Sequence, residues 1–171
     1  EEIVVTDDTL FALCLVGKGP LDDMDADRGS KGRDHRATGF PFLKKLMGSN
    51  KSPLWLNAER RLIAYDVKSG KEKWRADGKF APLSLATDAK RVYSHNGKCV
   101  VALDYNTGKK IWNSPNIPIW ARFYSNYGAS LVVYDDVVIF SGGENYSWIA
   151  PGSRGANDTM TAVSATTGKK L

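Results

Sequence analysis

Apolar residues recur along the chain in short runs that are separated by polar turns. Residues 3–5 and 10–16 form one such pair of runs, on either side of the polar stretch 6–9. The same arrangement returns at residues 131–140 and, in a looser form, at 85–93. Short apolar runs bounded by turn residues are typical of strands. Each pair of runs therefore predicts a β-hairpin.

A second pattern follows each of these hairpins and occurs at residues 64–74, 102–112 and 162–171. Each copy begins with alanine, passes through a polar turn with the dipeptide Gly-Lys and, in the first two copies, ends on tryptophan. The turn lies between two further strand-like segments, so it predicts a second hairpin. In the second repeat we expect strands at residues 81–86, 91–95, 98–104 and 110–113.

The spacing of the repeats indicates the fold class. Gly70 and Gly108 are 38 residues apart, whereas Gly108 and Gly168 are 60 apart because residues 142–157 are inserted. A period near 40 with four short strands is typical of the blades of a β-propeller. We expect an all-β fold, a partial β-propeller of about three four-stranded antiparallel blades with two insertions.

The predicted blades form one domain. Blade one covers residues 1–78, blade two 79–118 and blade three 119–171. Residues 17–58 interrupt blade one and residues 142–157 interrupt blade three, because the strand pattern stops at both places. Within the first insertion, apolar residues between a proline and a glycine predict a short helix.

The repeated turn has residue types that explain its shape. Asp66 and Asp104 stand where a strand ends, and a short carboxylate there can accept hydrogen bonds from turn amides; Ser164 replaces it in the third copy. A glycine in each turn supplies the positive φ that a short hairpin loop requires. These glycines are Gly70, Gly108 and Gly168.

The tryptophans of the pattern predict contacts between blades. Trp74 and Trp112 are expected in the core, wedged between neighbouring sheets. The third copy stops at Leu171, one position before the expected tryptophan. Three blades also leave apolar sheet faces open. We therefore expect a fragment of a longer polypeptide, with self-association as one way to cover those faces.

The pattern Ala-x-Asp-x-x-Thr/Ser-Gly-Lys-x-x-Trp resembles the repeat of PQQ-type, quinoprotein-like β-propellers. That family includes PQQ-dependent alcohol dehydrogenases and the outer-membrane assembly lipoprotein BamB, which binds no cofactor. The resemblance implies a larger propeller than this chain provides, and a periplasmic or secreted bacterial protein. It makes the repeat residues structural rather than catalytic.

PQQ dehydrogenases of that family carry a catalytic aspartate, a Ca²⁺ site of Glu, Asn and Asp, and two adjacent cysteines over the cofactor. The cysteines here, Cys14 and Cys99, are far apart, and Glu144-Asn145 is an isolated pair. We therefore expect no catalytic residue and no cofactor in this chain. Whether a longer protein that contains it binds PQQ stays open. Each cysteine is expected to be a small buried residue, with a bridge between them left open.

An acidic run in the first insertion suggests a metal-binding site. Asp23, Asp25 and Asp27 alternate, and Asp34 stands at the twelfth position of a loop counted from Asp23. Convergent carboxylates suit Ca²⁺. However, Arg28 stands where such a loop needs glycine, so a solvated acidic run is the competing interpretation.

The second insertion suggests a loop that binds another protein. Tyr146, Trp148 and Arg154 are residue types that anchor protein interfaces, and propeller loops gather at the rims of the ring. The alternative is that the two aromatic residues pack on the blade below.

Charge and hydropathy narrow the function classes. The net charge of +5 comes from Lys and Arg scattered over the turns, which does not favour nucleic-acid binding. No apolar run is long enough to span a membrane. The expected function is a non-catalytic binding or scaffold segment with a protein partner. The alternatives are part of a PQQ-dependent oxidoreductase, or a propeller appended to another catalytic domain.

Overall fold

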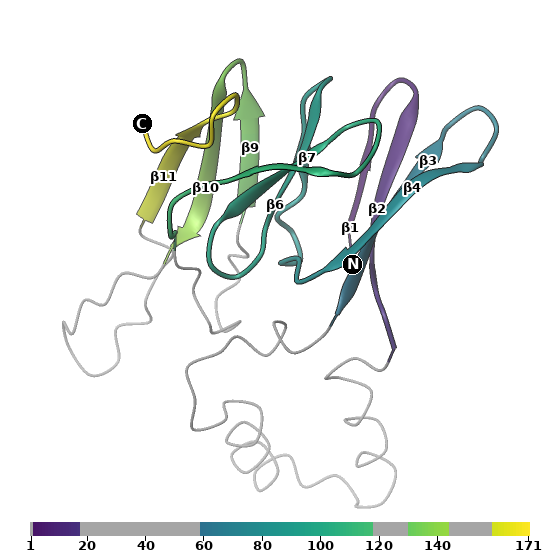
Figure 1. Ribbon diagram of the computed structural model, residues 1–171, viewed down its shortest axis with the longest axis horizontal. Helices are drawn as coiled ribbons and strands as arrows, with labels where there is room; N and C mark the ends of the chain where they lie inside the picture. Colours follow the sequence, from purple (N-terminus) through teal and green to yellow (C-terminus); the bar gives the residue numbers. More distant parts are fainter. Residues whose placement is uncertain (1, 18–58, 118–129, 144–158) are drawn as a thin grey trace, which may run out of the picture.

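Three antiparallel β-sheets stand side by side in the computed structural model (Figure 1). The structure describes residues 2–17, 59–117, 130–143 and 159–171. The regular elements in these ranges are all strands, and consecutive strands of a sheet are neighbours in it. The fold is thus all-β and a partial β-propeller, as the repeats predict, although the exact blade boundaries stay a prediction.

The first sheet has the order β1-β2-β3-β4. Its strands are β1 Glu2–Val5, β2 Thr9–Leu15, β3 Arg60–Asp66 and β4 Glu72–Gly78. Along β2 and β3, buried residues alternate with partly buried or exposed ones, since successive side chains of a strand point to opposite faces. Phe11, Leu13, Leu62 and Ala64 therefore share the buried face.

The second sheet has the order β5-β6-β7-β8. Its strands are β5 Ala86–Thr87, β6 Arg91–His95, β7 Val100–Asp104 and β8 Lys110–Asn113. Four of the five residues in each of β6 and β7 are buried, so this sheet is covered on both faces. The turn between β6 and β7 contains Asn96 and Gly97, as predicted, and Gly97 has a φ of 94°.

The prediction of a strand at residues 81–86 is mostly wrong, because only Ala86 of that range pairs with β6. The preceding residues form a turn in which Leu83 has a φ of 61° and the Ser84 hydroxyl donates to the Ala81 carbonyl. The amide of Leu85 donates to the Glu2 carboxylate of the first sheet. These local and long-range hydrogen bonds replace the strand ladder.

The third sheet has the order β11-β10-β9. Its strands are β9 Ser130–Tyr134, β10 Val137–Gly143 and β11 Thr159–Ser164. After the repeated turn, an isolated bridge pairs Val163 with Lys170, where the fourth strand was expected to begin.

The repeated turn has the same hydrogen bonds in all three sheets. In the second sheet, the amide of Gly108 donates to the carbonyl of Asp104 at 2.9 Å, and the amide of Asp104 donates to the carbonyl of Lys109 at 2.7 Å. The Asp104 carboxylate accepts from the amide of Thr107 at 2.8 Å. The predicted roles of the carboxylate and of the glycine are confirmed. The φ angles are 67° at Gly70, 68° at Gly108 and 71° at Gly168.

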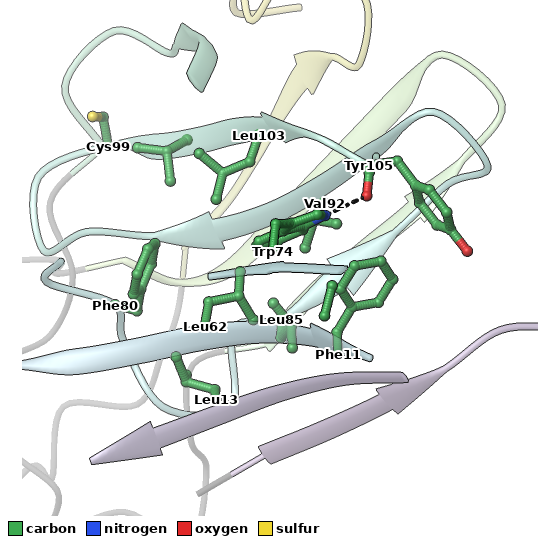
Figure 2. Packing of buried hydrophobic residues seen from close by; sticks show 12 residues of the cluster. Phe11, Leu13, Leu62, Trp74, Phe80, Leu85, Val92, Cys99, Leu103 and Tyr105 are labelled. Atoms are coloured by element: carbon green, nitrogen blue, oxygen red, sulfur yellow. Dashed lines mark hydrogen bonds between the residues drawn. The ribbon is translucent and has the colours of Figure 1, made fainter. Parts of the chain in front are cut away.

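Two hydrophobic clusters lie between the sheets. One lies between the first and second sheets and includes Phe11, Leu62 and Leu103 (Figure 2). The other lies between the second and third sheets and includes Tyr93 and Phe140. The second sheet contributes to both, because alternate residues of β7 point to opposite sides.

The meander separates the connections onto two opposite edges. The turns β1–β2, β3–β4, β7–β8 and β9–β10 lie on one edge, which we call the turn edge (Figure 1). At the other edge, Leu15 pairs with Arg60 and Gly143 with Thr159. The chain therefore leaves and re-enters the sheets around residues 18–58 and 144–158 on this second edge, which we call the insertion edge.

The two cysteines do not share one environment. Cys99 is buried, as predicted, whereas Cys14 is exposed on the outer face of the first sheet, and both thiols are free. The prediction for Cys14 is wrong because an apolar run does not show whether a further sheet covers its second face.

Candidate functional site

Trp74 joins the first sheet to the second. Its ring lies against the turn glycine of the next sheet, so closely that a Cβ on Gly108 would be 2.5 Å from the indole. The indole Nε1–H donates to the carbonyl of Tyr105 at 2.8 Å (Figure 2). Phe11 packs beside the ring, with centroids 5.8 Å apart. The glycine thus serves both the turn and the approach of the neighbouring tryptophan.

Trp112 repeats this contact between the second and third sheets. A Cβ on Gly168 would be 2.6 Å from its ring, and its Nε1–H donates to the carbonyl of Ala165 at 3.0 Å. Each tryptophan therefore docks on the turn of the following sheet, with one hydrogen bond at an equivalent carbonyl. Both tryptophans lie between sheets, as predicted, but only Trp74 is buried in the core, whereas Trp112 is partly buried against it.

A polar cluster at the turn edge joins the first sheet to the second. The Tyr105 hydroxyl donates to the Asp8 carboxylate and lies 2.6 Å from the Thr6 hydroxyl. The Lys73 ammonium donates to Asp8 at 3.3 Å and to the Thr9 hydroxyl at 2.7 Å. The hydrogen bond from Tyr105 is the largest cause that lowers the pKa of Asp8 to about 2. The cluster holds an ionised carboxylate between two sheets.

Sequence reasoning missed this cluster. Asp8 and Tyr105 are 97 residues apart, and nothing in either stretch indicates the other. The only available signal was the position of Tyr105 directly after the carboxylate of the repeated turn, where the backbone accepts the hydrogen bond from tryptophan.

His95 is a buried titratable group between the second and third sheets. Its ring stacks on Phe140 with centroids 4.4 Å apart. Nε2 lies 2.8 Å from the Ile117 carbonyl, and Nδ1 accepts from the amide of Gly97 at 2.9 Å. The neutral ring with hydrogen on Nε2 satisfies both contacts. Burial lowers the pKa of His95 to about 4.

The stability of the protein is therefore expected to fall on acidification through the range set by His95. Its folded pKa of about 4 lies below the unfolded value of 6.5, so the unfolded state binds the proton more readily. The contribution of the neutral His95 ring to the free energy of unfolding is complete above pH 6.5 and decreases as the pH falls towards about 4. Urea unfolding at a series of pH values measures this slope.

Substitution His95→Gln is expected to flatten the slope, and His35→Gln, which changes the other histidine, is the control. An unchanged slope in His95→Gln would assign the acid sensitivity to other groups.

Several predicted site residues lie outside the described part of the chain. These are the proposed Ca²⁺ ligands Asp23, Asp25, Asp27 and Asp34, and the proposed binding residues Tyr146, Trp148 and Arg154. They stay predictions. Within the described ranges, no three His, Cys, Asp or Glu side chains are grouped so that they could hold a metal ion.

The expectation that this chain holds no quinone cofactor stays a prediction. Cys14 lies on β2 of the first sheet and Cys99 in the turn before β7 of the second, so the two cysteines are not an adjacent pair. No reaction step is assigned to this chain on the basis of that cofactor. The described part of the chain contains no helix of the length and hydrophobicity that a membrane span requires.

Sheets of this kind, joined by tryptophans that dock on the next turn, define a segment of a β-propeller. A family model described as outer membrane protein assembly factor BamB matches residues 48–171. The chain belongs to this PQQ-type, BamB-like repeat family.

Two relatives illustrate the similarity. Quinohemoprotein alcohol dehydrogenase ADH IIB from Pseudomonas putida is 34% identical over 123 residues, which cover 64% of this chain. The crystal structure of BamB from Moraxella catarrhalis aligns with a TM-score of 0.44 and 20% identity over 67% of this chain. This chain spans 16% of the length of the dehydrogenase and 32% of the BamB chain.

Proposed function

We propose that this chain is a non-catalytic binding or scaffold segment of a PQQ-like β-propeller protein. The observation that carries the proposal is the arrangement of the connections: the three longest ones, β2–β3, β8–β9 and β10–β11, all leave from the insertion edge of a rigid stack of sheets. Loops held at one edge by a rigid scaffold are a common place for binding residues. The description of the matching family as an outer membrane protein assembly factor supports a protein partner and a periplasmic or secreted location.

The binding residues of the proposal are Tyr146, Trp148 and Arg154. All three belong to residue types that contribute most to protein interfaces. The segment that contains them joins Gly143 to Thr159 at the insertion edge. A partner bound there is expected to contact this segment and to leave the turn edge free.

A photo-cross-linking residue placed at position 148 of the full-length protein tests this proposal in the cells that produce it. We expect a discrete cross-linked protein at position 148 and none at Lys71, which is exposed at the turn edge. Tyr146→Ala and Arg154→Ala should reduce the yield. Equal yields from both edges, or no adduct at position 148, would contradict the proposal.

A second candidate function is a segment of a PQQ-dependent oxidoreductase whose catalytic residues lie elsewhere. The identity of 34% to a quinohemoprotein alcohol dehydrogenase favours it. The full-length protein incubated with PQQ and Ca²⁺ should then reduce an electron-accepting dye when an alcohol is added. Dye reduction that depends on both PQQ and the alcohol would support this candidate, and a rate equal to that without PQQ would exclude it.

A further inference from the structure

The turn between β6 and β7 contains an asparagine directly before a glycine, Asn96 and Gly97. No other asparagine in the sequence precedes a glycine. Because glycine has no side chain, its backbone nitrogen can come close to the side-chain carbonyl carbon of the preceding residue. The turn lies at the insertion edge, since β7 continues from it to the turn edge, where β7 joins β8.

The amide of Gly97 faces a fixed proton acceptor. It donates to Nδ1 of His95 at 2.9 Å, while Nε2 of the same ring lies 2.8 Å from the Ile117 carbonyl, to which it donates. The ring is held in place by Phe140, on which it stacks. Burial lowers the pKa of His95 to about 4, so Nδ1 carries no proton at neutral pH.

The hydrogen bond to His95 leaves the Gly97 nitrogen free to react. The N–H bond lies in the plane of the peptide group, whereas the nitrogen attacks a carbonyl through the electrons above that plane. The same geometry therefore allows Nδ1 to hold the hydrogen while the nitrogen forms a new bond.

The side-chain carbonyl of Asn96 is polarised by two backbone amides. Its Oδ1 accepts from the amide of Lys98 at 2.9 Å and from the amide of Cys99 at 3.0 Å. Such donors stabilise the negative charge that a carbonyl oxygen gains when its carbon is attacked. In the described ranges Nδ2 of Asn96 has no hydrogen-bond partner, and the residue is partly exposed, so the nitrogen can leave to water.

From this geometry we propose that Asn96 is a modification site at which the folded turn promotes loss of the side-chain amide. The Gly97 nitrogen is the nucleophile, Nδ1 of His95 accepts its proton, and the amides of Lys98 and Cys99 hold the oxygen.

The reaction needs no reagent other than water. The Gly97 nitrogen forms a bond to Cγ of Asn96 and transfers its proton to Nδ1 of His95. The bond from Cγ to Nδ2 then breaks, and Nδ2 takes the proton from His95 and leaves as ammonia. Water opens the resulting five-membered imide at either of its two carbonyl groups, which gives aspartate or isoaspartate at position 96.

Both products change the insertion edge. A carboxylate replaces a neutral amide and lowers the net charge of the chain by one. In isoaspartate the backbone also passes through the former side chain, which adds one methylene group to the turn. The modification therefore alters the charge and the shape of the edge, and it does not depend on the partner proposed to bind there.

Incubation of the purified full-length protein at neutral pH tests the proposal, with one sample folded and a second unfolded in urea. Mass spectrometry of the tryptic peptide 92–98 measures the loss of the amide and separates aspartate from isoaspartate. We expect position 96 to react about tenfold faster in the folded sample, because only the folded turn supplies the proton acceptor and both amide donors. The unfolded sample has the same Asn-Gly sequence and is therefore a matched control.

A substitution at His95 tests the role of Nδ1. His95→Gln keeps a side-chain donor for the Ile117 carbonyl but lacks the basic nitrogen, so the folded rate should fall about tenfold and the unfolded rate should stay the same. His35→Gln, which changes the other histidine, should react like the parent protein. Asn106, which is exposed in the turn between β7 and β8, should react no faster folded than unfolded.

Three outcomes overturn the proposal. The first is a rate at position 96 in the folded sample that is equal to or below the rate in the unfolded sample, a comparison that requires no variant. The second is a parent-like rate in His95→Gln with a folded circular dichroism spectrum. The third is aspartate without isoaspartate, because water rather than the Gly97 nitrogen would then have attacked the amide.

Discussion

Substitution Trp74→Ala is expected to lower the free energy of unfolding by about 3–5 kcal/mol, the usual range for removing a large buried aromatic side chain. The indole is 7% exposed and fills the space between Phe11 and the turn of the second sheet. Its loss leaves a cavity there and removes the hydrogen bond to the Tyr105 carbonyl. Urea unfolding followed by circular dichroism measures the change.

Ile111 provides the matched control for this substitution. It precedes Trp112 on β8 and is 48% exposed, so Ile111→Ala should change the free energy of unfolding by less than about 1 kcal/mol. A loss below about 1 kcal/mol in Trp74→Ala would show that the first two sheets are not held together by this contact.

Substitution Gly108→Ala is expected to destabilise the protein by roughly 2–4 kcal/mol. One part is the backbone strain of an alanine at a φ of 68°, about 1 kcal/mol. The larger part is the overlap of the new methyl group with the Trp74 ring, at 2.5 Å, which forces the indole out of its packed position at about 1–3 kcal/mol. The same unfolding experiment measures the effect.

Gly70→Ala separates the two parts, because Gly70 has the same φ but no described atom within 4 Å of the added methyl group. We therefore expect Gly70→Ala to lower the free energy of unfolding only by the backbone strain, about 1 kcal/mol. Equal losses at Gly70 and Gly108 would mean that close packing against tryptophan is not what requires glycine in the turn.

The turn was predictable because its interactions are local. Asp104 bonds to amides two and three residues further along the chain, and Gly108 supplies the positive φ four residues on. Residue type and spacing alone therefore indicate the hairpin. The same local reasoning failed at residues 81–86, because there the amide of Leu85 is satisfied by the carboxylate of Glu2 from another sheet.

The candidate site was predictable only in part. Trp74 and Trp112 were recognised as contacts between sheets, since a large apolar ring at the same place in each repeat needs a buried partner. The Asp8–Tyr105 hydrogen bond and the stacking of His95 on Phe140 were not, because each joins residues brought together by the packing of whole sheets.

The sequence by itself determined the number of repeats, the hairpins and the turn geometry. All three depend on hydrogen bonds and φ angles within a few residues of the chain. Only the tertiary structure decided which turn receives each tryptophan, and that both faces of the second sheet are buried while Cys14 lies exposed on the first. The physical reason is that a strand pattern specifies two faces but not what covers them. Coverage depends on the neighbouring sheet.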